Sequence, residues 1–271
     1  LSEDRYDNLR ALLLDKQNII LQGSPGVGKT FSAKRLAYSI LEEKDDSKVQ
    51  LVQFHQNYTY EDFVMGYKPN EDGGFYLRPG VFYNFCKRAQ QHHDGEYFFI
   101  IDEINRGNLS KILGELMMLI EKDYRGETLV LPYNQEEFSV PKNLYIIGMM
   151  NTADRSLAMM DYALRRRFSF FDMKPGFSTD GFKAYQRSLA NEDFAKLVSA
   201  IIDLNKVIES DDSLGSGFCI GHSYLCNKTD VDRDWLKRVV KFDIAPMLRE
   251  YWFDNDTKFN NEVQQLKSIV K

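Results

Sequence analysis

A glycine-rich run, Gly-Ser-Pro-Gly-Val-Gly-Lys-Thr, occupies residues 23–30. It directly follows residues 18–22, a short apolar run that reads as a buried strand. Its glycines permit backbone angles that other residues avoid, so successive N–H groups can point into one concavity. Residues from Lys29 to about Leu41 are predicted to form a helix, whose positive end lies at the same spot. The run therefore predicts a loop that binds nucleotide phosphates.

Two side chains of this loop have a specific role. Lys29 supplies a mobile positive charge for the β- and γ-phosphates, and the hydroxyl of Thr30 is suited to Mg²⁺. The alternative is a glycine turn that binds nothing. The predicted nucleotide contacts of the loop are Gly23, Pro25, Gly26, Val27, Gly28, Lys29, Thr30 and Phe31.

Two acids follow the most apolar strand signal in the chain, at residues 97–101. Asp102 can hold the water shell of Mg²⁺, and Glu103 can orient or deprotonate an attacking water. Two acids after a strand are usually only a solvated strand end. When a phosphate loop precedes them in the chain, however, two such acids are the residues expected to hold the metal ion and to activate the attacking water.

A third candidate group follows another apolar run, at residues 144–149. Ligands bind beyond the carboxyl ends of parallel strands, so Asn151 is expected at the same sheet edge as Lys29 and Asp102. Its amide could position the attacking water, and Asp154 is a further catalytic candidate in the same run. Asn151 could also cap the next helix, a role open to Ser156 as well.

Three consecutive arginines, Arg165, Arg166 and Arg167, precede an apolar strand signal at residues 168–171. They could form a solvated edge, a nucleic-acid patch, or arginine fingers that stabilise charge on a transferred phosphoryl group. The spacing alone does not choose among these.

The order of elements predicts an α/β fold. Strand signals at residues 18–22, 49–54, 97–101, 144–149 and 168–171 alternate with helical segments, which indicates a parallel sheet covered on both faces. Residues 57–85 read as irregular, with a short helix at 60–65 followed by a hairpin. A helix is predicted at 109–121 and a second hairpin at 128–140. We expect an α/β core over residues 1–175 and a helical domain over 176–271, apart from the region 215–221.

Composition limits the possible partners and the location. The net charge of −5 argues against a protein that binds DNA phosphates over its whole surface. Any nucleic-acid contact is therefore local or lies outside this chain. The longest apolar runs are too short to span a membrane, and the polar, acidic start excludes a secretory signal. The missing initiator Met suggests a fragment. Three cysteines favour a reducing compartment, and Cys219, His222 and Cys226 read as buried thiols beside a polar histidine rather than a zinc site.

Several runs of the sequence together resemble the McrB family, the AAA+ motor subunits of McrBC modification-dependent restriction systems. They are the phosphate loop with Phe31, Gln-Phe-His-Gln-Asn-Tyr-Thr-Tyr-Glu-Asp-Phe at 53–63, Ile-Asp-Glu-Ile-Asn-Arg-Gly-Asn-Leu-Ser-Lys at 101–111, Met-Asn-Thr-Ala-Asp-Arg-Ser at 150–156, Asp-Tyr-Ala-Leu-Arg-Arg-Arg-Phe at 161–168 and Ile-Gly-His-Ser-Tyr at 220–224. The likeness extends from about residue 18 to about residue 254, and the run at 150–156 is specific to this group of AAA+ proteins.

The resemblance implies an AAA+ core with five parallel strands, an extra hairpin at 57–80 and a helical lid. It implies a ring, with six subunits expected and nucleotide at each subunit boundary, completed by Arg166 and Arg167 as fingers and Arg165 as third choice. His222 is expected to contact nucleotide. The family uses GTP with Mg²⁺, works with a nuclease partner, McrC, and carries a separate N-terminal domain that reads methylated DNA. A bacterial or archaeal cytoplasm is the implied location.

Some residues depart from this pattern or leave alternatives open. Cys219 stands where a basic residue is expected, and Arg249 could act from the lid, although an exposed helix arginine is favoured. Asn-Lys-Thr-Asp at 227–230 matches a guanine-reading pattern of small GTPases but lies in the lid region, so it is interpreted as coincidence. The competing functions are an ATP-driven remodeller of the MoxR type and a nucleotide-gated assembly module without hydrolysis, against which Glu103 argues.

Overall fold

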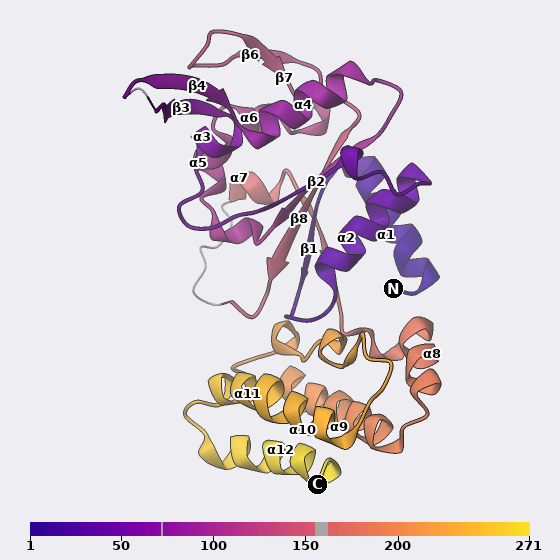
Figure 1. The fold of residues 1–271 in the computed structure, drawn as a ribbon. Coiled ribbons are helices and arrows are strands. Elements are labelled where there is room, and N and C mark those ends of the chain that lie inside the picture. Colours follow the sequence, from indigo (N-terminus) through magenta and orange to yellow (C-terminus); the bar gives the residue numbers. More distant parts are fainter. Residues whose placement is uncertain (72, 155–161) are drawn as a thin grey trace.

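A computed structural model describes residues 1–71, 73–154 and 162–271, and its centre is a five-stranded parallel sheet (Figure 1). The strand order is β2-β5-β8-β1-β9, so the strand that feeds the phosphate loop lies between two others. The strand bounds are β1 Asn18–Gly23, β2 Val49–Gln53, β5 Tyr97–Asp102, β8 Leu144–Asn151 and β9 Ser169–Asp172. All five strands and the parallel sheet were predicted, and the structure confirms them.

Helices cover both faces of the sheet because successive strand residues point to opposite sides. Ile19 and Leu21 of β1 pack with α1 (Glu3–Lys16) and α2 (Lys29–Leu41). Ile20 belongs to the cluster on the other face, with α3 (Tyr60–Phe63), α4 (Val81–Gln91), α5 (Leu109–Leu113) and α6 (Leu116–Leu119). The nucleotide loop is thus held by a strand buried on both faces.

Three helical segments differ from the predictions. The polar helix α1 was missed because, of its residues, only Leu9 and Leu13 are buried, too few for a clear periodicity. Helix α4 begins at Val81, inside the stretch predicted to be irregular. The single helix predicted at 109–121 is wrong: it breaks at Gly114, whose φ of 52° and ψ of −129° lie outside the helical region.

Two antiparallel hairpins project from the core, each in a segment where a hairpin was predicted (Figure 1). One pairs β3 (Met65–Pro69) with β4 (Phe75–Pro79), and the other pairs β6 (Thr128–Val130) with β7 (Glu137–Ser139). Tyr133, in the turn of the second hairpin, stacks on Tyr60 at 6.0 Å and meets Tyr67 of the first at 5.9 Å. These ring contacts join the two hairpins.

The C-terminal helices have a hydrophobic core of their own, which contains described residues from Phe177 to Val270. The clusters on the two faces of the sheet contain no described residue beyond Met173. The two separate cores support a domain boundary near residue 175, which we propose. The helices are α8 Asp180–Leu189, α9 Glu192–Glu209, α10 Arg233–Arg238, a π-helical segment Val239–Ile244, α11 Ala245–Tyr251 and α12 Asp256–Ile269.

The short helical turn α7 (Tyr162–Arg165) leads into β9. None of the described helices is long and apolar enough to cross a membrane.

Candidate nucleotide-binding site

The phosphate loop connects β1 to α2 and has the backbone that the glycines predict. Gly26 and Gly28 have φ values of 79° and 80°, in the left-handed region that side chains with a Cβ avoid. Lys29 is the first residue of α2, so the amino end of this helix faces the loop. Ser24 contributes a buried hydroxyl that has no hydrogen-bond partner among the described residues. Such an unpaired donor within a phosphate loop fits a site for a polar ligand.

The ammonium group of Lys29 is buried and donates to three oxygens. They are the carbonyls of Gly23 at 2.8 Å and Ser24 at 3.0 Å, and the side-chain oxygen of Asn151. Burial lowers the pKa of Lys29 to about 8, and the nearby Glu103 and Asp102 carboxylates oppose this shift. The charge that would meet the phosphates is therefore held by a few specific contacts.

Asp102 and Glu103 lie at the carboxyl end of β5, at the sheet edge where Asn151 ends β8. The register of the strands aligns Gly23 with Asn151, and Ile101 with Gly148. Glu103 has φ 52° and ψ 44°, which is uncommon for a residue with a Cβ. Its backbone N–H donates to Asp102 Oδ1 at 3.0 Å. The Glu103 carboxylate reaches Asn151 at the end of the neighbouring strand, β8.

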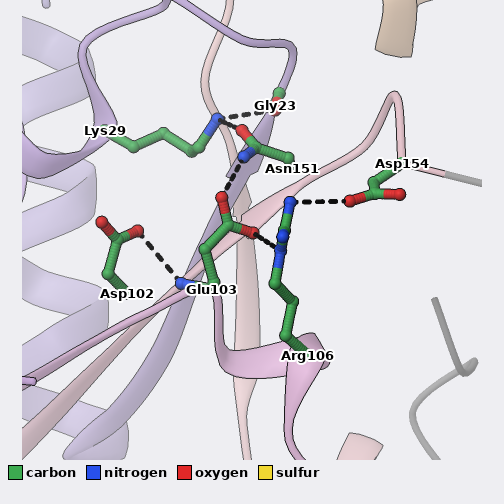
Figure 2. A network of polar contacts seen from close by, with 7 residues as sticks. All are labelled: Gly23, Lys29, Asp102, Glu103, Arg106, Asn151 and Asp154. Carbon is green, nitrogen blue, oxygen red and sulfur yellow. Dashed lines mark hydrogen bonds and ion pairs between the residues drawn. The ribbon is translucent and has the colours of Figure 1, made fainter. Parts of the chain in front are cut away.

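Asn151 bridges the cation and the carboxylate (Figure 2). Its Oδ1 accepts from Lys29, while its Nδ2 donates to Glu103 Oε1 at 2.6 Å. An ammonium can only donate and a carboxylate can only accept, so these partners fix the orientation of the amide. Both ends of the amide are used within the site. The alternative cap residue, Ser156, lies outside the described residues.

Arg106 extends this network, and sequence reasoning did not single it out (Figure 2). Its Nε lies 3.2 Å from Glu103 Oε2 and a terminal nitrogen lies 3.1 Å from Asp154 Oδ2. Asp154, predicted as catalytic, thus reaches Glu103 through an arginine. The available signal was that Arg106 follows Glu103 by one 3₁₀ turn, Ile104–Arg106. Nothing local to the sequence indicated Asp154 as its partner.

The residues predicted to hold Mg²⁺ suit a hard cation. Thr30 is exposed on the first turn of α2, and Asp102 is half-buried at the end of β5. Oxygen donors are the ligands that Mg²⁺ prefers, and it usually takes one or two protein ligands together with phosphate oxygens and water. Among the described residues, no group of three or more His, Cys, Asp or Glu side chains could hold a metal ion. The oxygen donors of Thr30 and Asp102 fit Mg²⁺ bound together with a nucleotide.

The lid contacts the phosphate loop through the segment 220–224. Ser223 N donates to Gly26 O at 2.9 Å, and a Cβ on Gly221 would lie 2.0 Å from the Gly26 carbonyl carbon. His222 accepts at Nδ1 from Gly176 N at 2.9 Å and lies near Gly28. Burial lowers the pKa of His222. His222 was predicted to contact nucleotide, and it lies beside the loop.

A buried asparagine of α9 fixes the start of this segment. Asn205 donates to Ile220 O at 3.0 Å and accepts from Ile220 N at 2.6 Å. The central helix of the lid is thereby tied, through Ile220 and Gly221, to the backbone of the phosphate loop.

The arginines before β9 lie at the opposite end of the sheet from their own phosphate loop. Asn18, the first residue of β1, donates to Arg167 O at 3.2 Å, whereas the loop follows the last residue of that strand. The Arg167 side chain is only 10% exposed, donating to Met117 O at 2.8 Å and meeting Glu121 Oε1 at 2.7 Å. Arg166 is 70% exposed, with a contact to Glu121 at 3.7 Å.

The remaining lid candidates have contacts away from nucleotide. Arg249 is paired with Asp256 and lies over the Phe259 ring at 4.9 Å. Cys219 and Cys226 donate to the carbonyls of Asn205 and His222, and burial raises both thiol pKa values. These contacts favour the exposed-arginine and buried-thiol interpretations.

Comparisons with known proteins agree with this geometry. Residues 18–168 match the AAA domain of the dynein-related subfamily, and residues 196–260 match the alpha-helical lid domain of McrB. The chain is 51% identical over 268 residues to the type IV methyl-directed restriction enzyme EcoKMcrB subunit of Escherichia coli (strain K12), covering 94% of this chain and 58% of that protein.

A second relative is the type II restriction enzyme BsuMI component YdiS of Bacillus subtilis (strain 168), with 26% identity over 193 residues, 57% of this chain and 56% of that protein. The chain thus spans little more than half the length of these two relatives. The matched core, the matched lid and the high identity lead to one conclusion: the chain belongs to the dynein-related subfamily of AAA domains and is a homologue of McrB.

Proposed function

We propose that this chain is the GTP-hydrolysing AAA+ motor unit of a modified-DNA restriction complex. The observation that carries the proposal is the chain of contacts Lys29–Asn151–Glu103 at the carboxyl edge of the sheet. The Asn151 amide joins Lys29, which is suited to bind phosphates, to Glu103, which is suited to activate water. A module that only bound nucleotide would have no need of a carboxylate oriented in this way.

In the proposed reaction, Lys29 neutralises the phosphates and Glu103 orients or deprotonates the attacking water. Asn151 holds Glu103 at a fixed distance from the phosphate loop, and Arg106 holds the other carboxylate oxygen. Mg²⁺ held by Thr30 and the water shell at Asp102 would neutralise charge on the triphosphate. Restricting the Glu103 carboxylate in this way favours a water positioned in line with the terminal phosphate.

The arginine finger is proposed to act on a neighbouring subunit. Arg166 lies far along the sheet from its own loop and is exposed, which supports a role in a ring, with six subunits as the expected number. Arg167 was an equal candidate from sequence, but its side chain is committed to Met117 and Glu121. Arg166 therefore ranks first, and the exposed Arg165, the third choice from sequence, is now placed ahead of Arg167.

GTP as the preferred nucleotide, an McrC-like nuclease as partner and a bacterial or archaeal cytoplasm as location are proposed from the relationship to McrB. In this proposal DNA is contacted mainly by the assembled complex and by an N-terminal domain that is separate from the motor. The net charge of −5 supports such a division of labour.

Parallel hydrolysis assays with GTP and ATP, with and without a candidate nuclease subunit, test the proposal. We expect GTP to be hydrolysed faster and the nuclease to stimulate it. Glu103→Gln should retain nucleotide binding and assembly while turnover falls by about 10²–10⁴-fold, the usual contribution of a general base. Glu127→Gln, at an exposed position away from the site, is the control.

Unchanged turnover in Glu103→Gln would remove the assignment of the water-activating residue. Hydrolysis of ATP alone, indifferent to the nuclease, would instead favour an ATP-driven remodeller.

A further inference from the structure

A cavity of about 740 Å³ lies between the start of α2 and the lid, and it borders the phosphate loop. Gly28 and Phe31 line it from the core, and His222 lines it from the lid. The loop at 226–229 closes another part of its wall. A nucleotide with its phosphates at Gly28 would have this cavity within reach of its base.

The closing loop is held in a defined shape. Asn227 has a φ of 64°, a left-handed angle that asparagine tolerates better than most residues. The Tyr185 hydroxyl donates to Lys228 O at 2.8 Å and accepts from Lys228 N at 3.1 Å. These two bonds hold the peptide units on both sides of the Lys228 Cα, so the backbone next to Asn227 is anchored.

The lining of the cavity is neutral or cationic. Lys174, Lys228 and Arg5 contribute to it, and its described lining includes no aspartate or glutamate. The Arg5 guanidinium already donates to Asp172 O and lies over the Phe171 ring at 4.7 Å. The Asn227 amide makes no hydrogen bond to any described residue, so its donor and its acceptor are both available.

Such a lining distinguishes the two purines of nucleoside triphosphates. Guanine presents two acceptors, O6 and N7, along one edge, whereas adenine presents N7 beside an amino donor. Cationic and amide donors complement the first edge and oppose the second. An amide can also accept from N1–H of a 6-oxopurine while it donates to O6.

We propose that Asn227 determines base specificity by reading the 6-oxo edge of a purine bound in this cavity. The inference rests on the proposed triphosphatase function and adds a residue that selects the base. Asn227 belongs to the run 227–230 that sequence reasoning interpreted as coincidence. Asp230 does not line the cavity, so the 2-amino group, which a carboxylate would read, is not recognised by this run.

Equilibrium binding of GTP, inosine triphosphate and ATP to the whole chain tests the assignment. The wild-type protein should bind GTP and inosine triphosphate within about threefold of each other, and ATP more weakly. Asn227→Gly keeps the left-handed backbone and deletes the amide. It should weaken GTP and inosine triphosphate by about tenfold, within the range for a good bidentate base contact, and ATP by less than threefold.

Asn260→Ala, at an exposed position of α12, is the matched control and should leave all three affinities unchanged. Asn227→Asp, which keeps a side chain able to adopt the same φ but loses the donor to O6, should lower the GTP preference as well. The role of Asn227 would be overturned if Asn227→Gly, with an unchanged melting temperature, lost equal affinity for GTP and ATP. It would also be overturned if this variant lost no affinity. Wild-type binding of inosine triphosphate that is as weak as that of ATP would overturn it too.

A wild-type protein that prefers ATP would contradict the proposed nucleotide choice itself. A GTP preference that survives in Asn227→Gly would contradict only the base-reading residue.

Discussion

Asn151 and Arg106 hold the two oxygens of the Glu103 carboxylate. At the scale of single residues, this divides the site into groups that would contact nucleotide and groups that position them. Asn151 touches both Lys29 and Glu103, so a shift of the phosphate loop would reach the carboxylate proposed to orient water through one side chain. Asp154 acts one step further out, through Arg106. The site is therefore a network in which Glu103 has little freedom.

Arg166 and Arg167 are adjacent, but truncating them should have different effects: one on turnover and the other on stability. Arg167→Ala removes contacts to Glu121 and Met117 from a mostly buried side chain, so the free energy of unfolding should fall by about 1–3 kcal/mol. Arg166→Ala should leave the melting temperature unchanged and lower turnover per assembled ring by up to about 10³-fold. Denaturation curves and hydrolysis assays on both variants measure this split. Normal turnover in Arg166→Ala would exclude it as the finger.

At the scale of elements, the lid segment 220–224 is packed against the phosphate loop. Gly221→Ala would place a Cβ against backbone atoms of Pro25 and Gly26, and backbone cannot give way as a flexible side chain does. We expect nucleotide affinity to fall about tenfold, since overpacking costs roughly 1–3 kcal/mol. Titration of nucleotide into the variant measures the loss.

Gly95→Ala is the control for this prediction, because a Cβ at Gly95 would first meet the Lys48 side chain, at an ordinary contact distance of 3.5 Å, and Gly95 does not line the cavity beside the phosphate loop. It should bind nucleotide as the wild type does. If both variants bound nucleotide as well as wild type, the contact between the lid and the loop would have no effect on binding.

A second element-scale feature is a carboxylate that joins the turn after α9 to α12. Asp211 Oδ2 accepts from Lys258 Nζ at 2.7 Å and Trp252 Nε1 at 2.9 Å. The hydrogen bond from Lys258, followed by those from Ser213 and Trp252, holds the pKa of Asp211 well below its usual range. A carboxyl whose pKa is lowered on folding stabilises the fold above its unfolded pKa of about 3.9, and that stability is lost as the pH falls.

Thermal melting followed from pH 7 to pH 3 should therefore show a loss of lid stability beginning near pH 4. Asp211→Asn should lower stability at pH 7 and reduce the part of the acid dependence that comes from this group. Identical pH profiles for the variant and the wild type would show that Asp211 does not link protonation to stability.

At the scale of the whole molecule, the phosphate loop and the exposed Arg166 lie at opposite ends of β1. One subunit cannot bring both to the same phosphate, whereas the proposed ring would bring the arginine of one subunit to the loop of the next. Hydrolysis would then be a property of the assembly.

Mixing two inactive variants tests this arrangement. Glu103→Gln retains Arg166, and Arg166→Ala retains Glu103, so some boundaries in a mixed ring contain both residues. Hydrolysis should be low for each variant alone and should recover in part when they are mixed at concentrations that permit assembly. A mixture no more active than its components would contradict a finger supplied by a neighbour.

The parallel sheet and the positions of the phosphate loop, Asp102, Glu103 and Asn151 could all be derived from the amino-acid sequence. These features are local: apolar runs define the strands, and glycine is the residue that most readily adopts a positive φ, as at Gly26 and Gly28. Because parallel strands end at one edge, the residues after β5 and β8 could be expected near Lys29. The break at Gly114 was missed, since periodicity does not report a single residue that leaves the helical region.

Which groups meet across long stretches of chain depended on tertiary packing. It joined Arg106 to Asp154, packed Gly221 on the phosphate loop, and buried Arg167 while leaving Arg166 exposed. It also placed Asn227 on the wall of a cavity shared with Gly28. Contacts of this kind depend on how whole elements pack, and their partners carry no signal in their immediate neighbours. The phosphate loop could thus be read from its own residues, but the surroundings that orient it could not.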